Sequence, residues 1–162
     1  WTAYADAVSW LNRLGDTVTL TGIAHYLRSN AAILAAGLTR VDDGPAVLAL
    51  PAGPGTFTVT ASEATQQISV AFDNTEDWAN EDAGALSVLM GMPQNATRSF
   101  FNGPWRWAGV IEGDSSTPPA SPAAITAPFT FQEGQRIWCQ ARVLRADGRV
   151  AVPTAVNFLA AA

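Results

Sequence analysis

The feature that most constrains the fold is a two-residue alternation of apolar and polar side chains, which recurs in short stretches between residues 56 and 159. Successive side chains of a β-strand point to opposite faces of the sheet, so this alternation is typical of strands that bury one face. The predicted core face consists of Phe57, Val59 and Ala61; Ile68, Val70 and Phe72; Leu86, Val88 and Met90; Trp105 and Trp107 with Ile111; and Ile137, Cys139, Ala141 and Val143. The pattern predicts a mainly β fold.

The last two strands are expected to form a hairpin. Its turn is Ala146-Asp147-Gly148-Arg149, because Asp-Gly is a strong turn signal between two alternating runs. The return strand contains Val150, Val152, Val156 and Phe158, and Pro153 interrupts it, as in an edge strand or a bulge.

The first 41 residues have a helical period instead. One helix is predicted from Thr2 to Leu14 and a second from Gly22 to Ala36, with Thr21 as its N-cap and Gly37 as its left-handed stop. The apolar face of the second helix would hold Ile23, Leu27, Ile33 and Leu34, and the alternation of residues 17–20 predicts a short strand. We therefore expect a two-helix segment over 1–41, a Gly- and Pro-rich linker over 42–55, and a β-sandwich over 56–162.

Two stretches of the C-terminal part resemble a fibronectin type III domain. Residues 133–143 (EGQRIWCQARV) with 145–150 (RADGRV) are similar to its last two strands, and residues 68–72 are similar to its second strand. Phe72 stands where that family usually has a core Trp. The resemblance covers roughly residues 55–160 and implies an immunoglobulin-like (fibronectin type III-like) β-sandwich, a fold that serves many functions.

A second resemblance is to a family of uncharacterised bacterial and phage-borne proteins. The matching motifs are Trp1-Thr2-Ala3-Tyr4-Ala5, then Leu20-Thr21-Gly22 through Tyr26 and Asn30, and finally Asp147-Gly148-Arg149. Members of that family look like longer chains with a basic N-terminal extension. The resemblance implies a structural component of a virion or of a cell surface.

Composition restricts the partners. Charged residues make up 14% of the chain, well below the roughly 25% of an average soluble domain, which favours a surface that another protein covers. The net charge of −5 and the absence of a basic run argue against nucleic acid as a partner. The apolar runs are shorter than the roughly 20 residues of a membrane span.

The residue inventory contains no catalytic motif. His25 is the only histidine, and Cys139, the only cysteine, is expected to pack in the core. The acidic stretch of Asp73, Glu76, Asp77, Glu81 and Asp82 is either a solvated loop or a calcium site, although its spacing does not match that of a helix–loop–helix calcium motif. We therefore predict no cofactor, no metal and no enzyme activity.

The most unusual stretch is residues 98–107 (RSFFNGPWRW), which hold four large aromatic rings and two arginines. These rings could face the core, dock a neighbouring subunit or stack on a carbohydrate. The second alternative is favoured by the enrichment of Trp and Arg in interface hot spots. Trp138 alternates with Ile137 and Cys139 and should point outward, which favours an interface. The candidate interface residues are Phe100, Phe101, Trp105, Arg106, Trp107 and Trp138.

These features together predict a structural protein that self-assembles as a homo-oligomer or decorates a larger assembly. We expect it in a virion or on an extracellular or cell surface. The Pro-rich segment over residues 115–122 would be an extended arm or a surface loop. The alternative function is a carbohydrate- or protein-binding module of a secreted or surface protein.

Overall fold

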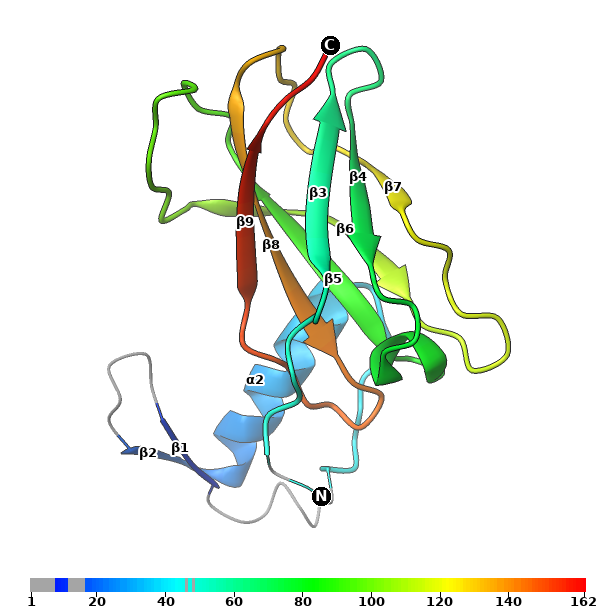
Figure 1. The fold of residues 1–162 in the computed structure, drawn as a ribbon. Helices are drawn as coiled ribbons and strands as arrows, with labels where there is room; N and C mark the ends of the chain where they lie inside the picture. Colours follow the sequence, from blue (N-terminus) through cyan, green and yellow to red (C-terminus); the bar gives the residue numbers. More distant parts are fainter. Residues whose placement is uncertain (1–7, 12–16, 46, 48) are drawn as a thin grey trace.

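The structure is a computed structural model that describes residues 8–11, 17–45, 47 and 49–162. Its main part is two antiparallel sheets, which confirms the mainly β prediction (Figure 1). The three-stranded sheet has the order β3 (Phe57–Ser62), β4 (Gln67–Phe72) and β7 (Ala123–Thr126). The four-stranded sheet has the order β6 (Trp105–Glu112), β5 (Ala85–Gly91), β8 (Arg136–Leu144) and β9 (Thr154–Leu159).

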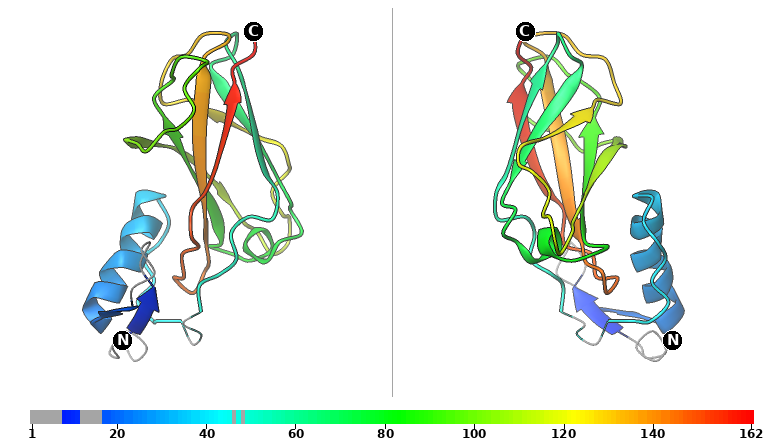
Figure 2. Two further views of the ribbon diagram at one scale, coloured as in Figure 1. Left: turned by 60° about the vertical axis from the view of Figure 1, so that its left-hand side comes forward. Right: turned by 90° about the vertical axis from the view of Figure 1, so that its right-hand side faces the viewer.

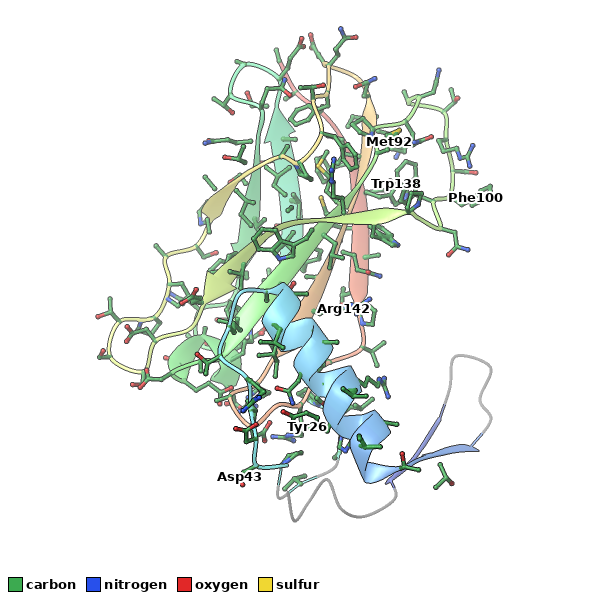
Figure 3. All side chains as sticks on the ribbon, turned by 180° about the vertical axis from the view of Figure 1, so that it is seen from behind. Tyr26, Asp43, Met92, Phe100, Trp138 and Arg142 are labelled. Carbon is green, nitrogen blue, oxygen red and sulfur yellow. The ribbon has the colours of Figure 1, made fainter. Side chains whose placement is uncertain are left out.

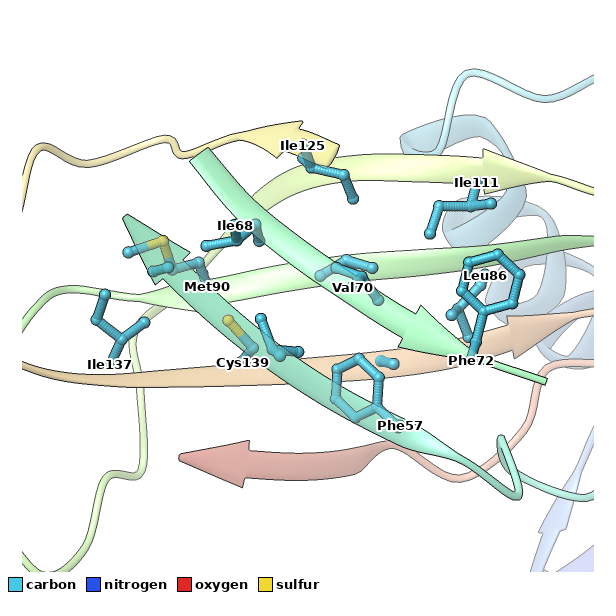
Figure 4. Close-up of a cluster of buried hydrophobic side chains, with 14 of the residues drawn as sticks. Phe57, Ile68, Val70, Phe72, Leu86, Met90, Ile111, Ile125, Ile137 and Cys139 are labelled. Carbon is cyan, nitrogen blue, oxygen red and sulfur yellow. The ribbon is translucent and has the colours of Figure 1, made fainter. Parts of the chain in front are cut away.

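The two sheets share one hydrophobic core between their facing surfaces. Figure 4 shows side chains of β3 and β4 directed toward those of β5 and β8, with Ile125 and Ile111 beside them. The predicted core residues of β3, β4, β5 and β8 are all buried, as alternation requires. Sequence periodicity therefore identified the inward face of these four strands correctly.

Trp78 is a core residue that the sequence analysis did not identify. It lies on the short 3₁₀-helix η1 (Asp77–Asn80), is 2% exposed, and its ring lies 5.3 Å from that of Phe72. Its indole N–H donates to Glu76 Oε2 at 2.7 Å, so the one polar atom of the buried ring is satisfied. The core therefore contains a Trp beside Phe72, supplied by a connection rather than by a strand.

The predicted helix over residues 2–14 is wrong where the structure describes it. Residues Val8–Leu11 form the strand β1, which pairs antiparallel with β2 (Thr17–Leu20), while residues 2–7 and 12–14 lie outside the described residues. Pairing with β2 gives the backbone of β1 hydrogen-bond partners along one edge, and such tertiary context overrides a weak helical propensity. The short strand predicted over residues 17–20 is confirmed.

The second predicted helix is confirmed as α2 (Gly22–Ala35), the one α-helix among the described residues. Thr21 caps it by accepting a hydrogen bond from the Ala24 amide. Gly37 has a φ of 80° and ends the helix in a Schellman motif, in which the Leu38 amide donates to the Ile33 carbonyl. This helix is too short for a membrane span, and no described helix meets that requirement.

The buried face of α2 differs from the predicted one. Ile33 is buried with Ser29, Asn30 and Ala36, whereas Ile23, Leu27 and Leu34 are each more than half exposed. The reason lies in the returning chain: the Asn30 side chain pairs with both backbone groups of Val41, at 2.8 and 2.9 Å. These bonds fix the polar side of the helix against residues 38–42 and leave the large apolar side chains outside.

Helix α2 lies against the outer side of the four-stranded sheet, opposite the three-stranded sheet (Figure 2). The contact is made by small or medium-sized side chains: Ala32, Ala36 and Leu38 pack against Ala85, Val110, Leu144 and Val150. The helix therefore covers the end of this face at which β5 begins, and the other end stays available.

The predicted C-terminal hairpin forms, with an interruption. Gly148 has a φ of 89° in the turn, and the Arg145 amide donates to the Arg149 carbonyl at 2.9 Å. The return chain makes a single bridge from Val150 to Leu144, and regular pairing resumes at Thr154, after Pro153. Strand β9 is an edge strand of its sheet, as the proline predicted.

Candidate interaction surface

The face of the four-stranded sheet that points away from the core is called here the outer face. Cross-strand partners point to the same side of a sheet, so the register identifies its members. Leu89 of β5 lies between two core residues and therefore points outward, flanked by Trp107 of β6 and Gln140 of β8. The next outward position on β5 is Gly91, which is opposite Trp105.

A β-bulge directs both tryptophans of β6 outward. The register between β5 and β6 shifts between Val88 and Leu89, and Ala108 is the extra residue on β6. One inserted residue reverses the side of the sheet to which the side chains on either side of it point. Ile111 therefore points into the core, whereas Trp105 and Trp107 do not. The prediction that these two rings share the core face with Ile111 is therefore wrong, and Trp107 is 46% exposed.

Phe101 covers the outer face at Gly91. A Cβ at position 91 would overlap the Phe101 ring, so the absence of a side chain there provides the space for this ring. The ring stacks on Trp138 at 5.6 Å and meets Trp105 edge-on at 5.0 Å. Trp138 points outward as predicted, yet it is only 6% exposed because the connection between β5 and β6 lies over it.

Three large apolar side chains remain exposed around this cluster. Phe100 is 65% exposed, Met92 52% and Trp107 46%. Figure 3 shows Met92, Trp138 and Phe100 at one end of the outer face, with α2 crossing the other end. A group of this kind on the surface marks an interaction site more often than a scattered single residue does.

Three arginines in this part of the fold each lie near an aromatic ring. The guanidinium of Arg98 is 4.8 Å from the centre of the Phe100 ring, that of Arg106 is 5.4 Å from Phe129, and that of Arg136 is 6.0 Å from Trp138. Within the described residues, none of the three forms an ion pair with a carboxylate. Arg106 is opposite the core residue Met90 and therefore points to the other side of the sheet, toward Phe129. We call Met92, Phe100 and Trp107 with Arg98 and Arg136 the arginine–aromatic surface.

The structure thus separates the six candidate interface residues into three groups. Phe100 and Trp107 are exposed at this surface, whereas Arg106 is exposed on the opposite side of the sheet. Phe101 and Trp105 are half-buried and Trp138 is buried, so these three rings hold the connection between β5 and β6 onto the sheet. Met92 and Arg98, in the connection between β5 and β6, and Arg136, at the start of β8, complete the surface but were not among the candidate interface residues.

The two candidate reactive side chains lie apart from this surface. Cys139 is fully buried in the core, as predicted, and burial raises the pKa of its thiol to about 12. His25 lies on α2, where burial and then the nearby Arg28 guanidinium lower the pKa of its imidazole. A thiol protonated at neutral pH is a poor nucleophile, so Cys139 serves packing.

The acidic stretch of residues 73–82 is organised by the protein's own donors. Glu81 forms an ion pair with Arg145 at 2.6 Å, and Asp77 reaches the same guanidinium at 3.1 Å. Glu76 accepts from Trp78 and from the Gly55 amide, whereas Asp73 caps its own turn at Thr75. No group of three or more potential metal ligands occurs among the described residues.

A shallow pocket of about 330 Å³ lies beside this stretch. Its lining includes Pro51, Gly53, Trp78, Val143 and Arg145. The carboxylates that reach it, Glu76 and Asp77, already bond protein donors. Its polar groups therefore have partners within the fold, and the arginine–aromatic surface is the stronger candidate for a functional site.

Comparisons with known proteins place the chain in no family. No family model matches it, and no curated protein matches it. Among solved structures, a family 76 glycoside hydrolase from a bovine Bacteroides thetaiotaomicron strain is similar over 68% of this chain, with a TM-score of 0.45 and 18% sequence identity. The chain spans about 20% of the length of that enzyme.

This match contradicts the prediction that the chain is not an enzyme, because the similar segment belongs to a glycoside hydrolase. That prediction rested on the lack of a catalytic motif, which is informative only about the residues of this chain. The match itself carries neither a fold nor an activity over to the chain, given its low TM-score.

Proposed function

We propose that the chain is an interaction module of a larger structural assembly and that it binds a neighbouring subunit through the arginine–aromatic surface. The observation that carries the proposal is the exposure of Phe100, Met92 and Trp107 on one end of the outer face. Trp and Arg are the residues most enriched in interface hot spots. The proposed setting is a virion or an extracellular surface.

The proposed scaffold is an immunoglobulin-like β-sandwich of the fibronectin type III kind. Seven strands in antiparallel sheets of three and four support it, as do the two facing surfaces that share one core. In such a scaffold the strands form a rigid support and the connections vary. The connection between β5 and β6 contributes Met92, Arg98 and Phe100 to the surface in this way.

The contribution of a single side chain can be worked out for Trp107. Its exposed 46% corresponds to about 100 Å² of mostly apolar area. Burial of that area in a complex would stabilise it by about 2.5 kcal/mol, which is within the range of a hot spot. Phe100 is exposed to a greater extent, so the pair can supply much of the affinity of a micromolar contact.

The test is sedimentation velocity of the purified chain across micromolar concentrations. We expect self-association, and we expect the double variant Phe100→Ser/Trp107→Ser to shift the chain to monomer with an unchanged circular dichroism spectrum. Val152→Ser is the matched control, because Val152 is 61% exposed but lies outside the surface. Equal association of the double variant and the wild type would refute the proposed role of this surface.

A second candidate function is carbohydrate binding on the same sheet. Trp107 lies beside Leu89 on the outer face and is 46% exposed. An exposed indole can stack on a sugar ring. Polysaccharide binding that Trp107→Ala abolishes would favour this function. The loss of binding must not be a consequence of dissociation to the monomer, so the monomeric double variant serves as the comparison.

A further inference from the structure

The exposed apolar side of α2 is a continuous stripe. Ile23, Leu27 and Leu34 are 58%, 60% and 55% exposed, and the exposed Ala31 lies between the last two. Residues three and four positions apart share one face of a helix, so these four uncharged side chains line one side of α2. We call them the apolar stripe. A surface helix of a globular protein normally turns such a side toward a core, so the stripe indicates a surface that a partner covers.

The apolar stripe points away from the protein's own four-stranded sheet. Ala32 and Ala36 pack against that sheet, beside Ala85 and Leu144. Ala36 follows Leu27 by nine residues, which at about 100° per residue places the two on opposite sides of the helix. The stripe is therefore directed to the same outer side of the molecule as the arginine–aromatic surface (Figure 3).

Helix α2 forms a step on this outer side. It covers the end of the outer face at which β5 begins, whereas the arginine–aromatic surface lies at the end where Phe101 covers Gly91 (Figure 3). Strand β5 runs from Ala85 to Gly91, and six residue steps of about 3.4 Å separate the two ends by about 20 Å. A helix with its side chains is about 10–12 Å wide, so this length accommodates a second helix beside α2.

We propose that the partner at the arginine–aromatic surface is helix α2 of a second copy of this chain, which docks its apolar stripe on Phe100 and Trp107. The two molecules face each other with their outer sides, and each helix lies between its own sheet and the sheet of its partner. The same contact is made twice about a two-fold axis, so the assembly closes as a dimer. The inference rests on the proposed function and names the partner and the element that it contributes.

The shape of the step favours this partner. Helix α2 raises one end of the outer face by the thickness of one helix, and the same helix of the second copy fills the lower end. The height of the step and the height of what fills it are therefore equal in both molecules.

The exposed area also agrees with such a dimer. The three large side chains of the apolar stripe and the three of the arginine–aromatic surface each expose roughly 100 Å². Both sets are covered in both copies, which buries about 1,200 Å², the lower limit of a specific interface. Contact of the two stripes with each other would bury only about half of this area, which is in the range of non-specific contacts.

An uncharged partner suits the two arginines of the surface, because both already donate within the fold. Arg98 Nε donates to the Phe100 carbonyl at 3.1 Å. Arg136 donates to the Ala96 carbonyl at 2.8 Å and to Asn157 Oδ1 at 2.6 Å. These bonds attach the connection between β5 and β6 to the sheet, and the docking of an apolar stripe leaves them intact.

The test is sedimentation velocity of the full chain with the apolar stripe made charged. In Leu27→Arg/Leu34→Arg we expect the dissociation constant of self-association to rise about a hundredfold or more, because the change affects both contacts of the dimer. Val152→Arg is the matched control, since Val152 is 61% exposed and belongs to neither the stripe nor the surface. Wild-type association of the stripe variant, with the fold verified by circular dichroism, overturns the inference.

A mixture of variants tests whether the stripe meets the surface. The stripe variant keeps an intact surface, and Phe100→Ser/Trp107→Ser keeps an intact stripe, so a mixed dimer retains one of its two contacts. We expect the mixture to associate more tightly than either variant alone and less tightly than the wild type. A mixture that associates no better than its components overturns the inference.

A single introduced cysteine tests the alternative in which two stripes meet each other. Cys139 is fully buried, so in Leu27→Cys the new thiol is the accessible one. The two stripes face opposite sheets in the proposed dimer, and we expect Leu27→Cys to form no disulfide-linked dimer faster than Val152→Cys does. Rapid cross-linking of Leu27→Cys alone refutes this arrangement.

The outcomes distinguish this inference from the proposed function. If Phe100→Ser/Trp107→Ser dissociates while Leu27→Arg/Leu34→Arg associates normally, the surface binds a different element and only the docking of α2 is refuted. A wild-type chain that stays monomeric at all concentrations refutes self-association and the docking of α2 together.

Discussion

Removal of the Phe101 ring is expected to weaken the attachment of the connection between β5 and β6. Phe101→Ala deletes the stacked contact with Trp138 and the edge-on contact with Trp105, and it uncovers the Cα of Gly91. Phe100→Ala is the matched control, because it is the same change one residue earlier at a site that is 65% exposed.

The magnitude follows from the burial of the ring. Truncation of a fully buried Phe to Ala costs about 3–5 kcal/mol. Phe101 is half-buried and makes two aromatic pairs, so we expect the free energy of unfolding to fall by about 2 kcal/mol in Phe101→Ala. The control should lose less than about 0.5 kcal/mol, as exposed sites do.

Urea denaturation measures both losses, and acrylamide quenching of Trp fluorescence reports whether Trp138 becomes accessible. Gly91→Ala is an independent route to the same state, since its Cβ would displace the Phe101 ring. The reasoning is refuted if Phe101→Ala and Phe100→Ala lose equal stability, or if quenching stays at the wild-type level in both Phe101→Ala and Gly91→Ala.

Three further results are expected. Trp78→Ala should lower the free energy of unfolding by about 3–5 kcal/mol in urea denaturation, because the ring is 2% exposed. The Cys139 thiol should react with Ellman's reagent at pH 8 only in denaturant, because burial raises its pKa to about 12. Hydrogen bonds from the Ser116 hydroxyl and then from the Thr117 and Ser116 amides lower the pKa of Asp114. This stabilisation is present above pH about 4 and is lost as the pH falls toward the lowered pKa, so Asp114→Asn should flatten that part of a stability–pH profile.

Most of the two-sheet fold could be predicted from residue alternation. In β3, β4, β5 and β8 every second residue is apolar without interruption, and all of the predicted core residues of these strands are buried. The helix α2 was predictable for a different reason, since Thr21 and Gly37 mark both of its ends. The exposure of the apolar side of α2 could not be predicted, because it depends on the contact between Asn30 and Val41, which lie 11 residues apart.

The N-terminal strand illustrates the limit of a short window. Residues 8–11 contain apolar side chains at a spacing compatible with a helix, and four residues cannot distinguish a helical period from an alternating one. The pairing of Val8 with Leu20 and of Leu11 with Thr17 decides the outcome. Such a cross-strand partner is a tertiary feature, and no local propensity contains it.

The candidate surface depends on two local departures from regular alternation. The extra residue Ala108 turns Trp105 and Trp107 away from the core, and Gly91 leaves an open position opposite Trp105 that Phe101 fills. The loss of either departure would change this face. Without the bulge the indoles would enter the core, and with a side chain at position 91 the connection between β5 and β6 would be lifted from Trp138. A rule based on alternation cannot foresee a surface that exists because the alternation is broken twice within one strand pair. Sites at which local rules fail in this way are also where functional features are expected, which supports the arginine–aromatic surface as the part of this chain that meets a partner.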